Sequence, residues 1–154
     1  MKQILFFLFS ISLTSIACSS AKKANSSVVT QGISGIVTQS TGNQMPMKDA
    51  PQSVPRGIAA TVLVYEPTNI SQVSRIGTSP VYTAINTNLV ASVVTDSTGA
   101  FTVALPAGSY SLFIQLGKQF YANLFDTNNN IALFTVEEGK LTTARLSVNN
   151  KASY

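Results

Sequence analysis

The 154-residue chain contains no histidine, and this absence excludes many kinds of active site. Histidine is the commonest general base and metal ligand, and it activates the nucleophile of Ser-His and Cys-His hydrolases. Only six acidic side chains are present, and the adjacent Glu137 and Glu138 would point to opposite faces of a strand. We interpret that pair as a solvated hairpin tip. The sequence therefore predicts a non-enzymatic protein that needs no cofactor and no metal.

Charged residues of both signs are scarce, at 10% of the chain. Setting aside the first 17 residues removes Lys2 from the ten basic side chains, so nine basic residues stand against six acidic ones. This surplus is mild and spread along the chain, without the basic cluster that a nucleic-acid surface needs. We therefore expect no nucleic-acid partner.

The single cysteine, Cys18, follows a short apolar run over residues 4–17. That run is too short to cross a bilayer as a helix, and its charged start and small-residue end are typical of a signal peptide over 1–17. Ser15-Ile16-Ala17-Cys18 resembles the lipobox of bacterial lipoproteins, in which a peptidase cuts before a lipid-modified cysteine. Ordinary signal-peptidase cleavage is the alternative, because the same residues fit its small-residue site. We expect lipid attachment at Cys18, since acylation would remove an exposed exported thiol.

Residues 18–31 are small, polar and without periodicity, which predicts a flexible tether of roughly 20 Å. Lys22 and Lys23 stand where surface-exported lipoproteins of the Bacteroidetes type resemble one another in having acidic residues. We therefore favour an outer-membrane lipoprotein of a Gram-negative bacterium whose domain faces the periplasm rather than the cell surface. Residues 32–149 are predicted to form one domain, and residues 150–154 a short tail.

Periodicity and turn residues predict an all-β domain, with no amphipathic helix after the signal peptide. Apolar residues alternate with polar or small ones along 101–105 and 109–115, so each strand has one face to bury against a second sheet. We expect a β-sandwich of about seven or eight mostly antiparallel strands. The expected strands are residues 32–38, 58–65, 88–95, 100–105, 109–116, 119–125, 131–136 and 141–149.

Three tight reversals punctuate the later strands. Asp96-Ser97-Thr98-Gly99 offers an aspartate to cap a type I turn and a glycine for the left-handed position of a bulged hairpin. It predicts that strands 88–95 and 100–105 pair with each other. Pro106-Ala107-Gly108 and Glu137-Glu138-Gly139-Lys140 predict two further reversals, and hence a meander.

Two segments are less regular: 39–57, which contains three prolines, and 66–87, which contains two. Loops of this length are usually functional or disordered. Residues 81–85 inside the second segment fit a short edge strand as well as a loop, and the sequence leaves that choice open.

Three segments in order and spacing resemble the carboxypeptidase regulatory-like domain. They are Gly35-Ile36-Val37, Val94-Thr95-Asp96-Ser97-Thr98-Gly99-Ala100-Phe101 and Leu105-Pro106-Ala107-Gly108-Ser109-Tyr110-Ser111-Leu112. This resemblance covers residues 32–149 and implies a transthyretin-like β-sandwich. In larger proteins the domain resembles a spacer, docking or folding-assistance module.

A closer likeness is to small Bacteroidetes-type lipoproteins of that fold. It is carried by Tyr82-Thr83-Ala84-Ile85, by Phe120-Tyr121-Ala122-Asn123-Leu124-Phe125-Asp126, and by the ending Lys151-Ala152-Ser153-Tyr154. These relatives imply no assigned activity, cofactor or ligand for the present chain.

Asp126, Asn128 and Asn130 carry side-chain oxygen atoms at alternate positions, which superficially resembles the start of a calcium-binding loop. Such a loop also needs further carboxylates and a closing glutamate. Aspartate and asparagine are equally suited to a hairpin tip, because they tolerate left-handed backbone and bond to it. We favour the turn and keep calcium as the alternative.

The aromatic residues around this loop could form a platform for the apolar face of a sugar, beside polar donors. The rings in question belong to Tyr82, Phe120, Tyr121 and Phe125. Core packing is the alternative interpretation, because half of the side chains of an alternating strand must face inward. The candidate binding surface consists of Tyr82, Tyr121, Asn123, Asp126, Asn128 and Asn130.

Asp96-Ser97-Thr98 also resembles the Asp-Ser/Thr-x acceptor of Bacteroidetes-type protein O-glycosylation. Ser97 and Thr98 are therefore candidate modification sites. The turn by itself also explains these residues.

We expect a lipid-anchored accessory protein that docks onto another envelope protein through edge strands or the two long loops. A carbohydrate- or peptide-binding surface is the alternative, and a structural or host-facing surface lipoprotein is a more remote one. The expected partners are the membrane, through the N-terminal lipid, an envelope protein and, in the alternative, a glycan.

Overall fold

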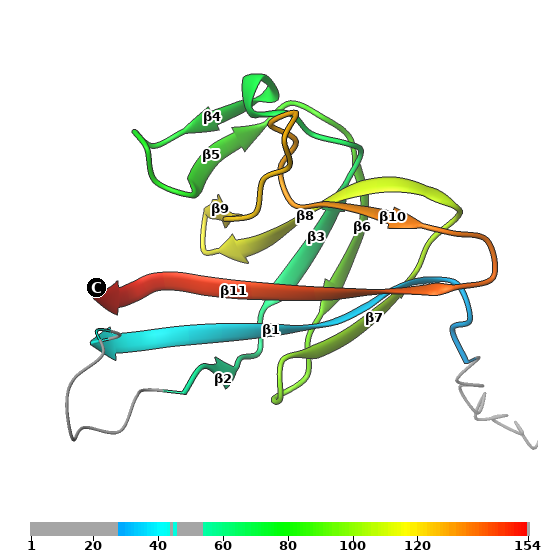
Figure 1. The fold of residues 1–154 in the computed structure, drawn as a ribbon, viewed down its shortest axis with the longest axis horizontal. Helices are drawn as coiled ribbons and strands as arrows, with labels where there is room; N and C mark the ends of the chain where they lie inside the picture. Colours follow the sequence, from blue (N-terminus) through cyan, green and yellow to red (C-terminus); the bar gives the residue numbers. More distant parts are fainter. Residues whose placement is uncertain (1–27, 44, 46–53, 154) are drawn as a thin grey trace, which may run out of the picture.

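The computed structural model of the chain describes residues 28–43, 45 and 54–153, and these are mostly strands (Figure 1). The predicted signal peptide 1–17, Cys18, and parts of the tether 18–31 and of the segment 39–57 lie outside the described residues. No helix in the described part is long and apolar enough to span a membrane. The elements are β1 (Gly32–Asn43), β2 (Arg56–Gly57), β3 (Thr61–Tyr65), the 3₁₀ helix η1 (Ile70–Gln72), β4 (Val73–Arg75), β5 (Val81–Ile85), β6 (Leu89–Val94), β7 (Ala100–Ala104), β8 (Gly108–Leu116), β9 (Gln119–Tyr121), β10 (Leu133–Val136) and β11 (Leu141–Ser153).

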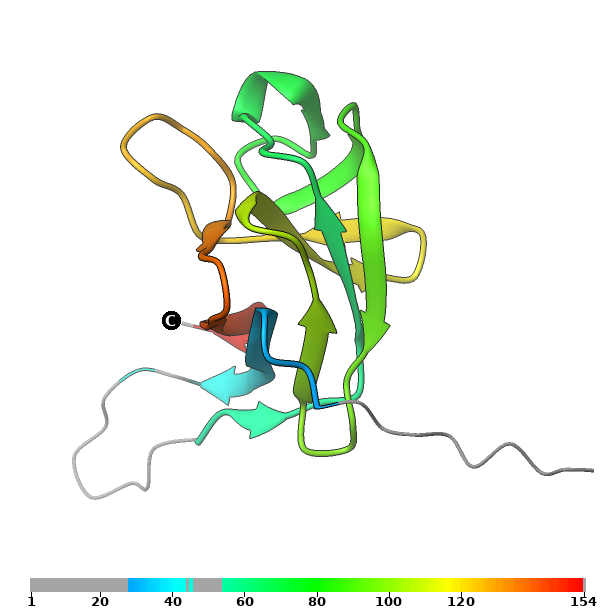
Figure 2. The ribbon, with the colours of Figure 1, turned by 90° about the vertical axis from the view of Figure 1, so that its right-hand side faces the viewer.

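These strands form two sheets packed as a sandwich, which confirms the predicted all-β class (Figures 1 and 2). In the smaller sheet β1 pairs with β11 on one side and with β7 and β2 on the other. In the larger sheet the order is β4-β5-β9-β8-β3-β6, and β10 also pairs with β8. Nearly all neighbours are antiparallel, but β1 and β11 run parallel. The strands β2 and β4 are additional to the eight that we predicted, and β5 is the segment 81–85 for which the sequence left strand or loop open.

Apolar side chains pack on both faces of the larger sheet. Val62 and Val64 of β3 face the smaller sheet and lie in the main core between the two sheets. Leu63 and Tyr65, which alternate with them, lie in a second cluster on the outer face, together with Tyr82 of β5. The segment that contains η1, β4 and β5 covers this outer cluster, and its side chains complete it.

The predicted hairpin of strands 88–95 and 100–105 is wrong, although its turn forms as expected. The Asp96 N–H donates to the Ala100 carbonyl at 2.9 Å, and Gly99 takes the left-handed conformation with φ of 84°. Beyond the turn, however, β6 pairs with β3 and β7 pairs with β1 in the other sheet. The turn is therefore a corner between sheets. Alternation shows which face of a strand is buried, but it does not choose the partner strand.

The predicted meander is also wrong for the same reason. Of the strands after β7, β8 and β9 form a hairpin, whereas β10 returns to the opposite end of β8 and β11 crosses to lie parallel to β1. β11 continues to Ser153, past Asn149, where we expected the domain to end. The long parallel pair ties the two ends of the described chain together.

The segment 66–87 has regular structure of its own. Asn69 caps η1 with a reciprocal capping box, in which its side chain accepts from the backbone and Gln72 bonds back to the Asn69 N–H at 2.9 Å. Residues 81–85 do form a strand, β5, but it pairs with β4 on one side and β9 on the other. The edge strand on this side of the sheet is therefore β4.

Candidate functional site

The two candidate tyrosines lie inside the protein. Tyr82 is 0% exposed, and its hydroxyl donates to the Ala122 carbonyl at 3.2 Å. Tyr121 is 2% exposed, and its hydroxyl accepts the backbone N–H of Asn149 in β11 at 3.0 Å. Burial raises the pKa of Tyr82. Both rings thus pack the fold, and Tyr121 joins the two sheets.

The other two rings of the proposed platform are placed differently. Phe120 is half-buried in the outer cluster. Phe125 is exposed, and the Arg75 guanidinium lies 5.9 Å from its ring centroid. The four rings therefore do not gather on one surface.

Asp126 organises the loop that follows β9. One of its carboxylate oxygens accepts the N–H groups of Asn128 and Asn130, each at 2.8 Å, and the other accepts the side-chain amide of Asn130 at 2.8 Å. Asn129 takes left-handed backbone with φ of 63°. The Asn130 amide, followed by these backbone donors, holds the pKa of Asp126 below its ordinary value. The carboxylate is thus engaged by N–H donors of its own loop.

This loop also packs on η1. The Asn69 amide donates to the Asn128 carbonyl at 2.8 Å, and the Ile70 N–H donates to the Asn129 carbonyl at 3.0 Å. The loop therefore braces the segment that carries β4 and β5. Among the described residues, no group of three or more acidic or cysteine side chains lies close enough to hold a metal ion.

The candidate modification sites lie at the exposed corner between β6 and β7. The Thr98 hydroxyl donates to the Asp96 carboxylate at 2.6 Å, and the Thr98 N–H donates to the same oxygen at 2.8 Å. Both Ser97 and Thr98 are exposed. Of the two, Ser97 is not held by the hydrogen bonds that fix the Asp96 turn.

Asn123 lies apart from the Asp126 loop, beside β11. Its amide donates to the Ser147 hydroxyl at 3.3 Å. Together with Tyr121 it lines a hollow of about 410 Å³ against the end of β11. The structure thus divides the candidate residues between the interior, a self-bonded loop and this hollow.

The edge strand β6 is a candidate surface that the sequence did not reveal. Within the described residues β6 pairs only with β3, and in Figure 2 it is the long light-green strand on the right-hand side of β3. Three of its six residues are large, apolar and exposed: Leu89 at 52%, Val90 at 43% and Val94 at 70%. The strand has no charged residue. Exposed apolar edge strands of this kind are typical sites of strand addition.

The backbone of β6 is oriented to accept another strand. The Thr95 N–H donates to the Ala60 carbonyl of the β3 side at 2.9 Å. Because backbone direction alternates along an antiparallel strand, Ala91 and Val93 also face β3, and Ser92 and Val94 point their N–H and C=O groups away from it. An incoming strand would find these groups along the open edge.

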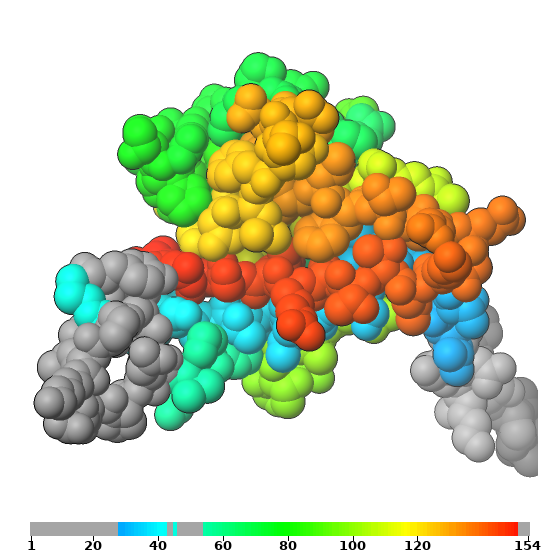
Figure 3. All heavy atoms as spheres, viewed as in Figure 1, coloured from blue at the N-terminus to red at the C-terminus, as the bar shows by residue number. Residues whose placement is uncertain are grey.

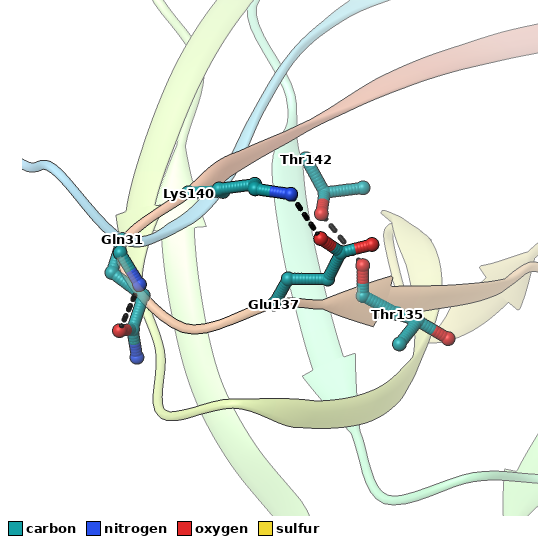
Figure 4. A network of polar contacts seen from close by, with 6 residues as sticks. Gln31, Thr135, Glu137, Lys140 and Thr142 are labelled. Carbon is teal, nitrogen blue, oxygen red and sulfur yellow. Dashed lines mark hydrogen bonds and ion pairs between the residues drawn. The ribbon is translucent and has the colours of Figure 1, made fainter.

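The other edges are shorter, charged or covered. β4 has three residues, an exposed arginine and a register shift. β11 is tied to the larger sheet at two places. The Thr142 hydroxyl donates to the Thr135 carbonyl at 2.6 Å (Figure 4), and the Asn149 N–H donates to the Tyr121 hydroxyl. β7 exposes only alanine and threonine side chains on its outer face. Among these edges, β6 alone combines length, apolar side chains and absence of charge.

The predicted hairpin would have given β6 a partner in the β7 strand, which is why the sequence reading missed this edge. The sequence does carry one signal, the composition of residues 89–94. Five of these six residues are apolar, and they occupy both faces of the strand. A strand buried on one face alternates more strictly.

Comparison with known proteins gives no match: no model of a protein family, no curated protein and no solved structure matches this chain. The resemblance noted from the sequence therefore stays a prediction.

Proposed function

We propose that this chain is a non-enzymatic, lipid-anchored protein of the outer membrane that docks onto another envelope protein through β6. The observation that carries the proposal is the open, uncharged edge of β6 with its three exposed apolar side chains. An extended segment of the partner would add to the larger sheet beside β6. The sequence resemblance of residues 32–149 to the carboxypeptidase regulatory-like domain, which resembles a docking module in larger proteins, supports this role.

Both the backbone and the side chains of β6 would take part in binding the partner strand. Backbone groups of Ser92 and Val94 would supply main-chain hydrogen bonds, which give affinity without regard to sequence. Val90 and Val94 would select apolar side chains at alternate positions of the partner strand. A hollow of about 460 Å³ beside Val94, lined also by Thr61 and Gln115, offers room for one longer side chain.

The anchor and the edge would work together. A lipid on Cys18 and the tether 18–31 would confine the domain to within roughly 20 Å of the membrane surface. Confinement raises the effective concentration of the domain near a membrane-embedded partner. A periplasm-facing domain would therefore need only modest intrinsic affinity.

Charged substitutions at the edge test the proposal. The full chain, tagged and cross-linked in intact envelopes, is purified, and the proteins that travel with it are identified by mass spectrometry. Val90→Lys and Val94→Lys are expected to abolish recovery of the partner, because lysine at an edge strand disfavours pairing. Ile76→Lys, a charge placed at an exposed apolar residue beyond β4, is the matched control and should leave recovery unchanged.

Two results would contradict docking through β6. The first is equal recovery of a partner by the lysine variants and the unmodified chain. The second is recovery of the lipoprotein alone from native envelopes. Cleavage of the domain by protease added to intact cells would place it on the surface and favour the structural or host-facing role.

A further inference from the structure

A second surface feature lies at the opposite side of the larger sheet from β6. It is the hollow of about 410 Å³ where the start of β5, the segment after β9 and the end of β11 meet. In Figure 3 the yellow atoms that follow β9 lie directly against the red atoms of β11. The residues that matter here are Pro80, Val81, Tyr121, Asn123, Asn149 and Asn150.

The walls of this hollow are fixed by hydrogen bonds. Val81 of β5 and Tyr121 of β9 are paired residues, and the Ala122 N–H donates to the Pro80 carbonyl at 3.2 Å. The Tyr121 hydroxyl accepts the Asn149 N–H at 3.0 Å and so holds β11 against β9. The hollow is therefore largely preformed, as ligand sites usually are, and its volume lies in their range of about 300–1,000 Å³.

Three carboxamides line the hollow, and part of their hydrogen-bonding capacity remains available. The Asn123 side-chain amide donates to the Ser147 hydroxyl, and the Asn150 side-chain oxygen accepts from the Gln39 side-chain amide at 3.3 Å. Within the described residues, no hydrogen bond engages the side chain of Asn149. A carboxamide has two donor hydrogens and an accepting oxygen, so each of the three can still bond to a ligand.

The composition of the wall indicates the ligand class. None of the described residues that line the hollow is charged, and Pro80, Val81 and Tyr121 supply apolar surface next to the amides. Sugar hydroxyls both donate and accept, as carboxamides do, whereas the C–H face of a sugar ring is apolar. An anionic ligand would find no cation among these described lining residues.

We propose that this hollow binds a neutral carbohydrate, with Asn149 and Asn150 bonding the hydroxyls and Pro80 and Val81 contacting the ring. This inference is independent of docking through β6. The two sites lie at opposite sides of the sheet and share no residue.

The test is a titration of the ¹⁵N-labelled full chain with maltotetraose, cellotetraose, xylotetraose and chitotetraose, followed by NMR. At least one sugar should shift the side-chain amide signals of Asn123, Asn149 and Asn150 in a saturable way. Asn149→Ala should weaken that binding about tenfold, because it removes a side chain that bonds to the ligand. Asn86→Ala, at an exposed asparagine after β5, should not change it.

Asn149→Ala should fold normally, because the bond to Tyr121 comes from the backbone N–H. Asn150→Ala, at an exposed residue, is a second variant with the same expected effect. Absence of saturable shifts with all four sugars would overturn the proposal, as would unchanged affinity in both variants. A tetra-alanine peptide that shifts the same amides where the sugars do not would identify a peptide site instead.

Discussion

The two edges of the larger sheet are built in opposite ways. β4 has three residues, and its register shifts between Ser74 and Arg75. The Arg75 guanidinium bonds to the carbonyls of Thr78 and Ser79 and lies over the ring of Phe125. β6 has six uncharged residues, and it pairs with β3 in register from Ala91 to Val94, with a register shift only at the Leu89 end. Short, bulged and charged edges resist the addition of another strand, so the contrast shows that only one edge of this sheet is protected.

The side chains next to the two edges also differ, because those near β4 are covered and those of β6 are exposed. On the β4 side, β5 and η1 cover the outer face of the sheet with a cluster that includes Tyr65, Tyr82 and Phe113. At β6, Leu89, Val90 and Val94 remain exposed. The β4 side thus contributes to stability, while the β6 side leaves apolar surface available for contact with another molecule.

The largest predicted effect is that of Tyr82→Ala on the protected side. The ring is fully buried and packs edge to face on Phe113, with centroids 5.7 Å apart. Its removal should lower the free energy of unfolding by about 3–5 kcal/mol, through lost burial and the cavity left behind. Urea unfolding of the purified chain measures this loss.

Tyr82→Phe is the matched control. It keeps the ring and loses only the hydrogen bond to Ala122, so it should cost about 1 kcal/mol. Equal losses in the two variants would mean that the hydroxyl, and not the ring, holds β5 to the sheet.

A smaller loss is expected for Asn69→Ala. This substitution removes the cap of η1 and the bond from Asn69 to the Asp126 loop. Loss of such a cap costs about 1 kcal/mol. Hydrogen exchange should increase in β4 and β5 but not in β6. Asn88→Ala, which removes an exposed bond to Glu66, is the control and should leave exchange in β4 unchanged.

Acid should weaken both sides of the sheet through one aspartate on each. Asp96 lies in the turn after β6, and Asp126 organises the loop that packs on η1. Hydrogen bonds hold the pKa of each below its ordinary value of 3.8, chiefly the bond from the Thr98 hydroxyl to Asp96 and the bond from the Asn130 amide to Asp126. A lowered folded-state pKa means that the unfolded chain takes up protons first. The stabilisation is therefore present above about pH 4 and is lost as pH falls from there through the lowered pKa.

Urea midpoints followed from neutral into acid pH measure this loss. Asp126→Asn should flatten the pH dependence, because its side chain no longer titrates. An acid transition identical to that of the unmodified chain would show that the Asp126 bonds do not contribute to stability.

The smallest effect on stability is expected on the open side. Val94→Lys changes a side chain that is 70% exposed, so the free energy of unfolding should change by no more than about 0.5 kcal/mol. The same substitution should abolish docking. A loss of stability as large as that of Tyr82→Ala would show that Val94 packs the fold and would remove the basis for a contact surface.

Local patterns predicted the fold class, the positions of eight strands and the Asp96 turn. They did not predict strand order, because the faces of β6 and β7 are compatible either with a hairpin or with two different sheets. The open edge of β6 is a consequence of that strand order, so it could not be predicted without it. The burial of Tyr82 and Tyr121 likewise depends on β5 and β9 becoming neighbours, which no local signal encodes. The hollow beside Asn149 forms only because β11 crosses to pair with β1, which no local pattern predicts.

The most direct test of docking through β6 compares the two edges in intact native envelopes. A photo-cross-linking residue is placed at Ser92 in β6 or at Ser74 in β4, both exposed serines on edge strands. Docking through β6 predicts a specific cross-linked partner from position 92 and none from position 74. Cross-links of equal yield from both positions, or from position 74 alone, would contradict docking through β6.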